Sequence, residues 1–173
     1  DVWEHLREFV AHDDGLPVYE CGQWTVRKLF FLGHYLWLVA RTMHGKGFTS
    51  LNYADLFCGP GVDTVRGNTL DPRYPGSPLL AAGLPTGFDR ILISDENSAA
   101  VAATAARIER LGCRAKVISF EEDANQVIEG IVSAIPSGSL TVAFVDPYSL
   151  TIRFETIAKL AACGKVDLVV LFA

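Results

Sequence analysis

The sequence predicts an α/β protein with a doubly wound, mostly parallel sheet and an N-terminal helical segment. Five short apolar runs alternate with helical segments over the last two thirds of the 173 residues. The runs are apolar throughout rather than at every second position, which is typical of strands whose two faces are both covered by helices. The expected strands are residues 52–57, 90–94, 116–120, 140–145 and 166–172.

The helices are predicted from apolar residues at helical spacing and from residues that begin or end helices. Ser77 followed by Pro78 resembles a helix start, with the serine as the cap. Between the first strand and this helix, residues 59–74 are expected to form a long polar connection. The expected crossover helices are 78–83, 98–111, 123–135 and 154–163.

Residues 1–48 are expected to form the N-terminal helical segment, with helices at 2–10 and 24–43 separated by a break at 13–17. Residues 49–173 are expected to form the α/β domain. Because a domain seldom ends on its most apolar strand, the run at 166–172 predicts that further C-terminal strands belong to this fold.

Composition narrows the classes of function. Half of the residues are hydrophobic and the net charge is −5, so the chain is neither disordered nor held to nucleic acid by its overall field. Nucleic acid stays a possible partner through a local basic cluster, for which a solvated face is the alternative. That cluster comprises Arg27, Lys28, Arg41 and Lys46.

The cysteines and the length of the apolar runs indicate the cellular compartment of the protein. The four cysteines are scattered without a C-x-x-C pair, which predicts free thiols in a cytoplasmic protein and no zinc site. No uninterrupted apolar run reaches about 18 residues, so the sequence predicts no membrane association through a spanning helix.

The most informative segment is the turn after the first expected strand. There Asp55, Phe57, Gly59 and Gly61 lie in the run Asp-Leu-Phe-Cys-Gly-Pro-Gly. Gly59 can adopt a positive φ, and Gly61 allows the backbone to approach a ligand closely. Asp55 lies in an apolar run, where a carboxylate needs hydrogen-bond donors. We expect a cofactor-binding turn in which these residues surround the ligand.

Acidic and amide side chains follow the next two strands. Asp95 and Glu96 end the second strand, where a carboxylate can accept both ribose hydroxyls of a nucleoside. Asp123 and Asn125 follow the third, where they can bind the adenine amine. Both positions are also favourable for helix N-caps, which is the alternative interpretation.

Asp146, Pro147 and Tyr148 follow the fourth strand. Asp146 offers an acceptor for a substrate amine, Pro147 makes the turn rigid, and Tyr148 offers a ring face. An ordinary Asp-Pro turn with a packed tyrosine is the alternative. Because the ends of parallel strands share one edge, the four turns are expected to form one site.

The glycine pattern favours S-adenosylmethionine (SAM) over a nicotinamide dinucleotide. The dinucleotide fingerprint requires Gly or Ala three residues after the second glycine, and Thr64 stands there. The long connection after Gly61 also predicts no helix N-terminus beside the turn, where a pyrophosphate would bind. SAM carries no phosphate and tolerates this arrangement better.

Several of these motifs together resemble the three-Cys-motif partner proteins, the TcmP family, over about residues 24–172. The motifs are Lys28 with Tyr35, the run 53–61, Gly76-Ser77-Pro78, Asp123-Ala124-Asn125 and the run 144–148. Cys58 stands where the family pattern has alanine. The resemblance implies a Rossmann-like fold of the SAM methyltransferase type and a separate partner protein that carries the cysteine motif.

Two functions follow as hypotheses. The first is a SAM-dependent methyltransferase acting on an amine of a nucleic-acid base, because Asp146-Pro147-Tyr148 is similar to the Asp-Pro-Pro-Tyr motif of such enzymes. One proline is missing, which moves Tyr148 one place. The alternative is a non-catalytic module that binds a three-Cys-motif protein. A nicotinamide oxidoreductase is a more distant third.

Overall fold

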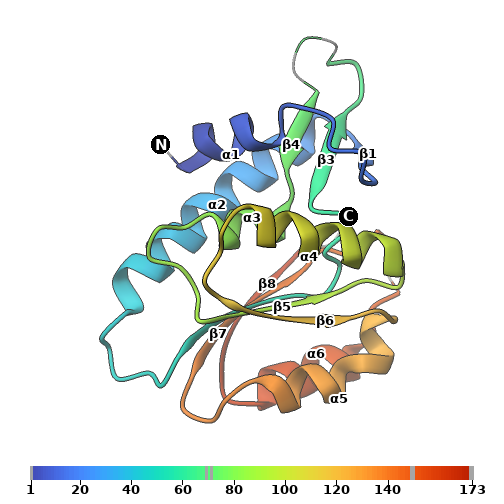
Figure 1. The fold of residues 1–173 in the computed structure, drawn as a ribbon. Coiled ribbons are helices and arrows are strands. Elements are labelled where there is room, and N and C mark those ends of the chain that lie inside the picture. The colour runs from blue at the N-terminus through green and yellow to red at the C-terminus, as the bar shows by residue number, and fades with distance from the viewer. Residues whose placement is uncertain (1, 69, 71, 149–150, 172–173) are drawn as a thin grey trace.

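The computed structural model describes residues 2–68, 70, 72–148 and 151–171. Its main sheet has five parallel strands in the order β6-β5-β2-β7-β8 (Figure 1). The chain starts in the middle of the sheet, runs to one edge and then to the other, so the order reverses between β2 and β7. The predicted doubly wound, Rossmann-like parallel fold is confirmed. The strands are β2 (Leu51–Asp55), β5 (Arg90–Ser94), β6 (Lys116–Phe120), β7 (Leu140–Val145) and β8 (Lys165–Val170).

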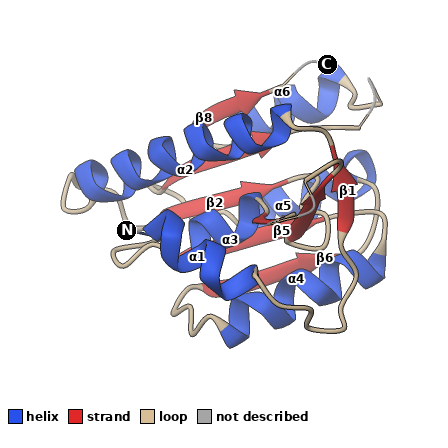
Figure 2. Ribbon diagram, turned by 90° about the horizontal axis from the view of Figure 1, so that it is seen from above, coloured by secondary structure: helices blue, strands red, loops and turns tan. Residues whose placement is uncertain are grey.

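Helices cover both faces of this sheet, as the apolar strands require. Figures 1 and 2 show one group of helices on one face and a second group towards the other. The first group is α5 (Ala124–Ala134) and α6 (Phe154–Ala162). The second group is α1 (Val2–Val10), α2 (Trp24–Met43), α3 (Ser77–Ala82) and α4 (Ser98–Arg110).

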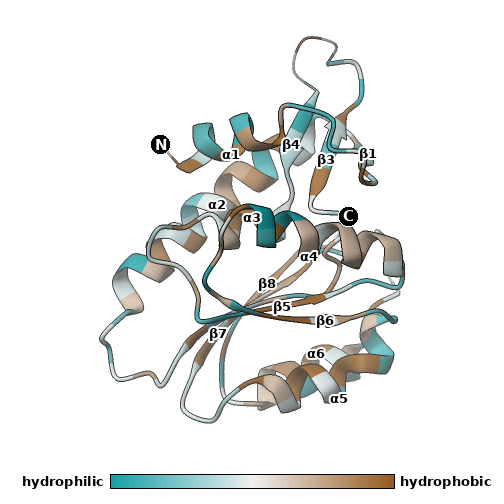
Figure 3. Cartoon of the chain, in the orientation of Figure 1, coloured by the Kyte–Doolittle hydropathy of each residue, from teal (hydrophilic) through white to brown (hydrophobic). Residues whose placement is uncertain are grey.

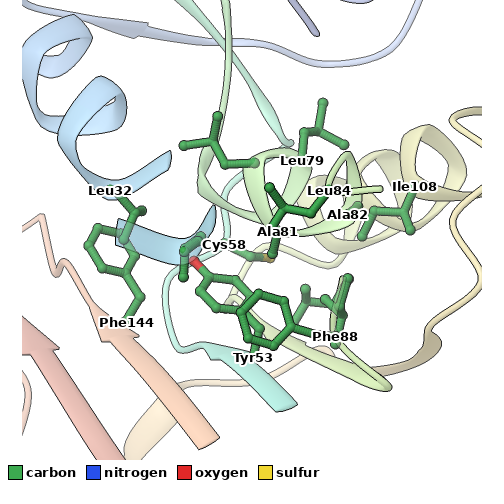
Figure 4. Close-up of a cluster of buried hydrophobic side chains, with 14 of the residues drawn as sticks. Leu32, Tyr53, Cys58, Leu79, Ala81, Ala82, Leu84, Phe88, Ile108 and Phe144 are labelled. Carbon is green, nitrogen blue, oxygen red and sulfur yellow. The ribbon is translucent and has the colours of Figure 1, made fainter. Parts of the chain in front are cut away.

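Successive residues of each central strand enter different cores. Tyr53 and Phe144 pack in the core beneath α2, α3 and α4, whereas Ala54 and Val145 pack against α5 and α6. The hydrophobic colouring of these strands in Figure 3 fits this two-sided burial. In Figure 4 the ring of Tyr53 lies beside that of Phe88, with the ring centroids 5.8 Å apart.

A second, smaller sheet was not predicted. It contains β1 (Tyr19–Cys21), β3 (Val62–Val65) and β4 (Arg73–Pro75) in the order β1-β3-β4. The segment 59–74, expected as an irregular connection, therefore contributes two strands, which lie above the main sheet in Figure 1. These strands have three or four residues and no alternating apolar pattern, and β1 pairs in parallel with a strand far along the chain. Local sequence signals cannot reveal such pairing.

Most other predicted bounds differ from the structure by one or two residues, which is the usual uncertainty of element ends. The predicted serine cap is wrong, because Gly76 is the N-cap of α3 and Ser77 is its first residue. The Ser77 hydroxyl instead donates a hydrogen bond to Asp55 Oδ2 at 2.5 Å. Residue 172, the predicted end of the last strand, lies outside the described residues.

A buried arginine of α4 connects the N-terminal segment to the turn that follows β2. Arg107 is 1% exposed, and its guanidinium donates to both carboxylate oxygens of Asp14 at 2.6 and 2.8 Å. It also donates to the carbonyl oxygens of Pro17 at 2.8 Å and Pro60 at 2.6 Å. One side chain therefore connects the segment before β1 to the turn at Gly59–Gly61 after β2, which we call the glycine turn.

Candidate functional site

A cavity of about 260 Å³ lies at the carboxyl ends of β2 and β7, where the strand order reverses. Ligands of open α/β sheets bind at this position, because the two crossover connections leave in opposite directions and open a crevice. The glycine turn lines one part of the cavity, and the turn after β7 lines another. The N-terminal part of α2 and the strands β1 and β3 complete the lining.

The glycine turn has the predicted backbone. Gly59 and Gly61 have φ angles of 55° and 81°, which confirms the expected positive φ at Gly59. Both residues line the cavity. A Cβ at Gly61 would lie 2.9 Å from Thr104 Oγ1, and a Cβ at Gly59 would lie 3.3 Å from the Tyr19 ring. The close approach that requires glycine is therefore to the protein's own α4 and β1.

The chain returns to the glycine turn after an excursion through β3 and β4. The backbone N–H of Gly76 donates to the carbonyl oxygen of Gly61 at 2.8 Å, and α3 begins directly afterwards. Gly76 and Ser77 line the cavity. The expectation that no helix N-terminus lies beside the turn is therefore wrong, so the preference for SAM needs other grounds.

Asp55 supports the turn from inside the core. It is 1% exposed and accepts hydrogen bonds from the Tyr53 hydroxyl at 2.8 Å, the Ser77 hydroxyl at 2.5 Å and the Phe57 backbone N–H at 3.2 Å. Burial raises the pKa of Asp55 to about 6, and the three donors oppose that rise. The predicted need for donors is met. Phe57 and Ser77 line the cavity, whereas Asp55 does not.

Asp95 is also engaged by the backbone. Its two carboxylate oxygens accept the N–H groups of Gly59 at 3.0 Å and Asn97 at 2.9 Å, and the residue is 7% exposed. Glu96 is exposed, and neither acid lines the cavity. The Tyr19 ring lies over Gly59, and its hydroxyl accepts a hydrogen bond from the Asn97 side chain at 3.2 Å. Tyr19 thus covers the glycine turn on the side of Asp95.

Asp123 and Asn125 lie away from the cavity lining. Asp123 is the N-cap of α5 and accepts the backbone N–H of Asn125 at 2.9 Å, which is the alternative that the sequence left open. The Asn125 side chain accepts from the Arg153 N–H at 2.9 Å and the Thr156 hydroxyl at 2.7 Å. It therefore joins α5 to the start of α6, and binding of adenine stays a prediction.

Asp146, Pro147 and Tyr148 all line the cavity, together with Lys28 of α2. The Lys28 ammonium forms an ion pair with Asp146 Oδ2 and lies 4.5 Å from the centroid of the Trp24 ring. The sequence analysis named Lys28 in the basic cluster and in the family resemblance but did not expect it in the cavity, because it lies on a helix far from the strand-end motifs. Tyr148 is 75% exposed, and its ring makes an edge contact with the Tyr19 ring.

Asp63 of β3 is a cavity residue that the sequence analysis missed. No described residue donates a hydrogen bond to its carboxylate. Burial raises the pKa of Asp63 to about 6, nearby Lys28 lowers it, and Asp146 raises it further. A possible signal was an acidic residue two places after the Gly-x-Gly turn, but it lay in a segment expected to be irregular.

Further acidic residues lie along the carboxyl edge of the sheet. Exposed or partly exposed carboxylates follow β5 and β6, in addition to Asp63 and Asp146. These carboxylates are Glu96, Glu121, Glu122 and Asp123. An edge of this charge attracts cations and repels a polyanion.

Among the described residues, no helix is long and apolar enough to cross a membrane. In the same part of the chain, no group of three or more His, Cys, Asp or Glu side chains is arranged to hold a metal ion.

No family model and no curated protein matches the sequence. Solved structures similar to this chain include a conserved hypothetical protein of Streptococcus pyogenes, with 18% identity and a TM-score of 0.45 over 69% of this chain and 63% of that one. A Legionella pneumophila protein of family DUF519 has 15% identity and a TM-score of 0.49 over 76% and 60%. A Clostridium thermocellum protein provisionally described as an rRNA methylase has 17% identity and a TM-score of 0.41 over 74% and 60%.

This chain therefore spans about 60% of the length of each of these three solved structures. At these identities and TM-scores the likenesses carry no argument about function. The assignment to the Rossmann-like class, to which the methyltransferase-like folds also belong, rests on the strand order and the parallel pairing of the chain itself.

Proposed function

We propose that this chain is a SAM-binding domain that catalyses methyl transfer to a nitrogen acceptor. One observation carries the proposal: a single cavity at the reversal of strand order is lined both by the glycine turn and by Asp146-Pro147-Tyr148. The first turn suits the methionine end of SAM, and the second suits an amine that receives the methyl group.

The charges of the cavity support a cationic cofactor. Lys28 compensates Asp146, and Asp63 leaves one further negative charge when it is ionised. SAM carries one net positive charge, because its sulfonium adds to a zwitterionic amino acid. A dinucleotide would instead bring phosphates beside these carboxylates. Charge thus replaces loop length as the ground for preferring SAM.

The size of the cavity implies that a side chain moves when SAM binds. A volume of about 260 Å³ is below the ~300–1,000 Å³ that is usual for drug-sized ligands. Tyr19 lines the cavity and lies over Gly59, whose N–H donates to Asp95. It is held by an edge contact with Tyr148, at 5.7 Å between ring centroids, and by the hydrogen bond from Asn97. Its rotation would let the nucleoside reach Asp95.

SAM, when bound, supplies an electrophilic methyl group on a sulfonium. Asp146 accepts a hydrogen bond from the acceptor nitrogen and thereby orients its lone pair, while the ammonium of Lys28 fixes the position of Asp146. The exposed ring of Tyr148 stacks on a planar acceptor at the mouth. The proton that the nitrogen loses passes to a carboxylate of the cavity or to water.

The acceptor predicted from the sequence, an amine of a nucleic-acid base, stays a prediction. Tyr148 suits a planar base, but the acidic carboxyl edge of the sheet disfavours a polyanion. Methyl transfer from radiolabelled SAM to single-stranded oligonucleotides, compared with transfer to small amines, decides between these acceptors.

Calorimetric titration with SAM tests the proposal. We expect one binding site. Asp146→Asn should lose methyl transfer even at saturating SAM, because it keeps the shape and removes the charged acceptor, and it should also weaken SAM binding, because Lys28 loses its partner in the cavity. Asp167→Asn, a matched change on β8 away from the cavity lining, should retain both. Absence of heat and of a thermal shift at millimolar SAM would overturn the proposal.

A second candidate function is docking of a three-Cys-motif protein without catalysis, and the surface of α2 favours it. Five of the eight exposed large hydrophobic side chains among the described residues lie on this helix. They are Trp24, Phe30, Phe31, Trp37 and Leu38, with exposures of 38–63%. Aromatic side chains of this kind are common anchors of protein interfaces. A pull-down of the partner that Phe31→Ser abolishes, from a protein that binds no SAM, would favour this function.

A further inference from the structure

We propose that Asp63 forms a cation subsite in the cavity, which binds the positive charge of a sulfonium and so distinguishes SAM from its uncharged-sulfur product, S-adenosylhomocysteine. The inference rests on the proposed function and concerns a residue outside the predicted motifs. It assigns to the inserted strands β3 and β4 a role in selecting the ligand.

Asp63 differs from the other carboxylates around the cavity because no described residue donates a hydrogen bond to it or forms a direct ion pair with it, and Lys28 acts on it only at a distance. Asp55 accepts three hydrogen bonds, and Asp95 accepts two backbone N–H groups. Asp146 is paired with Lys28, and Glu20 accepts from the Arg66 guanidinium at 2.7 Å. Asp63 is therefore the carboxylate of the cavity with the least compensation.

The position of Asp63 is fixed by the small sheet. Its Cα pairs with Tyr19 of β1 on one side and with Tyr74 of β4 on the other. The flanking Val62 and Val65 are 2% and 5% exposed and anchor the strand in the core. The pairing on both sides thus fixes the backbone of Asp63 at the cavity wall, where its side chain is half-buried.

An unpaired carboxylate in this place is unfavourable for the folded protein alone. Burial keeps its pKa raised, to about 6, so that it is still ionised at neutral pH. A cationic ligand would supply the missing compensation. Groups that oppose the stability of the empty fold are characteristic of binding sites.

Asp63 also lies in the part of the cavity where we expect the sulfur of the ligand. A ligand with its amino acid at Gly59 and Gly61 and its methyl group towards Asp146 has its sulfonium between these turns. Asp63 lines the same volume and interacts electrostatically with Lys28 and Asp146. The carboxylate therefore faces the region where SAM is charged and S-adenosylhomocysteine is neutral.

The test is calorimetric titration of the wild type, Asp63→Asn and Glu20→Gln with three probes. The probes are SAM, S-adenosylhomocysteine and an analogue in which a protonated amino group replaces the sulfonium. Glu20→Gln is the matched control, because Glu20 also lines the cavity but is exposed and already paired. The amine analogue separates charge from methyl transfer.

We expect Asp63→Asn to weaken SAM and the amine analogue about 10- to 100-fold, which is the scale of one charge pair in a partly buried site. Binding of S-adenosylhomocysteine should change less than about threefold, and Glu20→Gln should alter none of the three. Asp63→Ser, which removes the same charge with a smaller side chain, should repeat the pattern.

Equal weakening of SAM and S-adenosylhomocysteine, or unchanged SAM binding, would overturn the subsite while leaving the proposed function intact. A wild type that binds none of the probes would overturn both. Thermal melting of each variant identifies losses of affinity that come from misfolding.

Discussion

Replacement of Asp63 by asparagine should stabilise the protein at neutral pH. The substitution keeps the size and shape of the side chain and removes a charge that has no hydrogen-bond donor among the described residues. The pKa of Asp63 is raised from 3.8 to about 6, so folding favours its protonated form. The ionised carboxylate therefore opposes folding, and asparagine does not.

The pKa gives the magnitude and the pH window. A rise from 3.8 to about 6 corresponds to about 3 kcal/mol of lost stability above pH 6, at 1.36 kcal/mol per pH unit. Water in the open cavity screens the charge, so we expect about 1–2 kcal/mol in practice. The loss is absent well below pH 3.8, develops as the pH rises between 3.8 and 6, and is complete above 6.

Thermal melting of the wild type and Asp63→Asn without ligand, at several pH values from 4 to 8, measures this effect. A gain of 1 kcal/mol raises the Tm of a chain of this size by about 2–4 °C. The variant should melt about 2–8 °C above the wild type at pH 7.5, and the difference should vanish towards pH 4. Asp55 also titrates near pH 6, but it is present in both proteins and its contribution cancels in the difference. A constant difference across the pH range, or a less stable variant at pH 7.5, would refute the reasoning.

Three further predictions concern the support and surroundings of the cavity. Gly61→Ala should destabilise the fold by about 1–3 kcal/mol in urea unfolding, because its Cβ would lie 2.9 Å from Thr104 Oγ1 and its φ is 81°; no loss of stability would contradict the close packing. Arg107→Ala should lose about 3–5 kcal/mol by the same assay, because it leaves the carbonyl oxygens of Pro17 and Pro60 without their donor and Asp14 with Arg110 alone, and a loss below 1 kcal/mol would show that the N-terminal segment is held otherwise. Phe31→Ser should change the free energy of unfolding by less than about 0.5 kcal/mol, because the side chain is 63% exposed; a larger loss would mean that it packs within the fold.

The main sheet could be predicted from the sequence because each element has a local signal. The strand at 90–94 is a continuous apolar run, and the helix that follows β6 begins at an aspartate cap, so their positions depend on neighbouring residues only. The glycine turn was also predictable, since few sequences other than Gly-x-Gly after a strand provide two positive φ angles.

The small sheet and the connections within the site could not be predicted. Asp63 became a cavity residue only when β3 paired with β1, and Ser77 became a donor to Asp55 only when the excursion closed between Gly61 and Gly76. Both the β1–β3 pairing and the Gly61–Gly76 hydrogen bond join segments that are distant in the sequence, and nothing in the local composition indicates them. The strand-end acids were located correctly, but whether an acid faces the ligand or the backbone depends on the packed structure.

A crystal structure of the protein with S-adenosylhomocysteine tests most directly whether the cavity between β2 and β7 holds the cofactor. The proposed function predicts ligand density with the amino acid beside Gly59 and Gly61, the sulfur facing Asp63, and the Tyr19 ring rotated away from Asn97. Ligand bound at another surface, or an empty cavity at a concentration that saturates calorimetric binding, would contradict it.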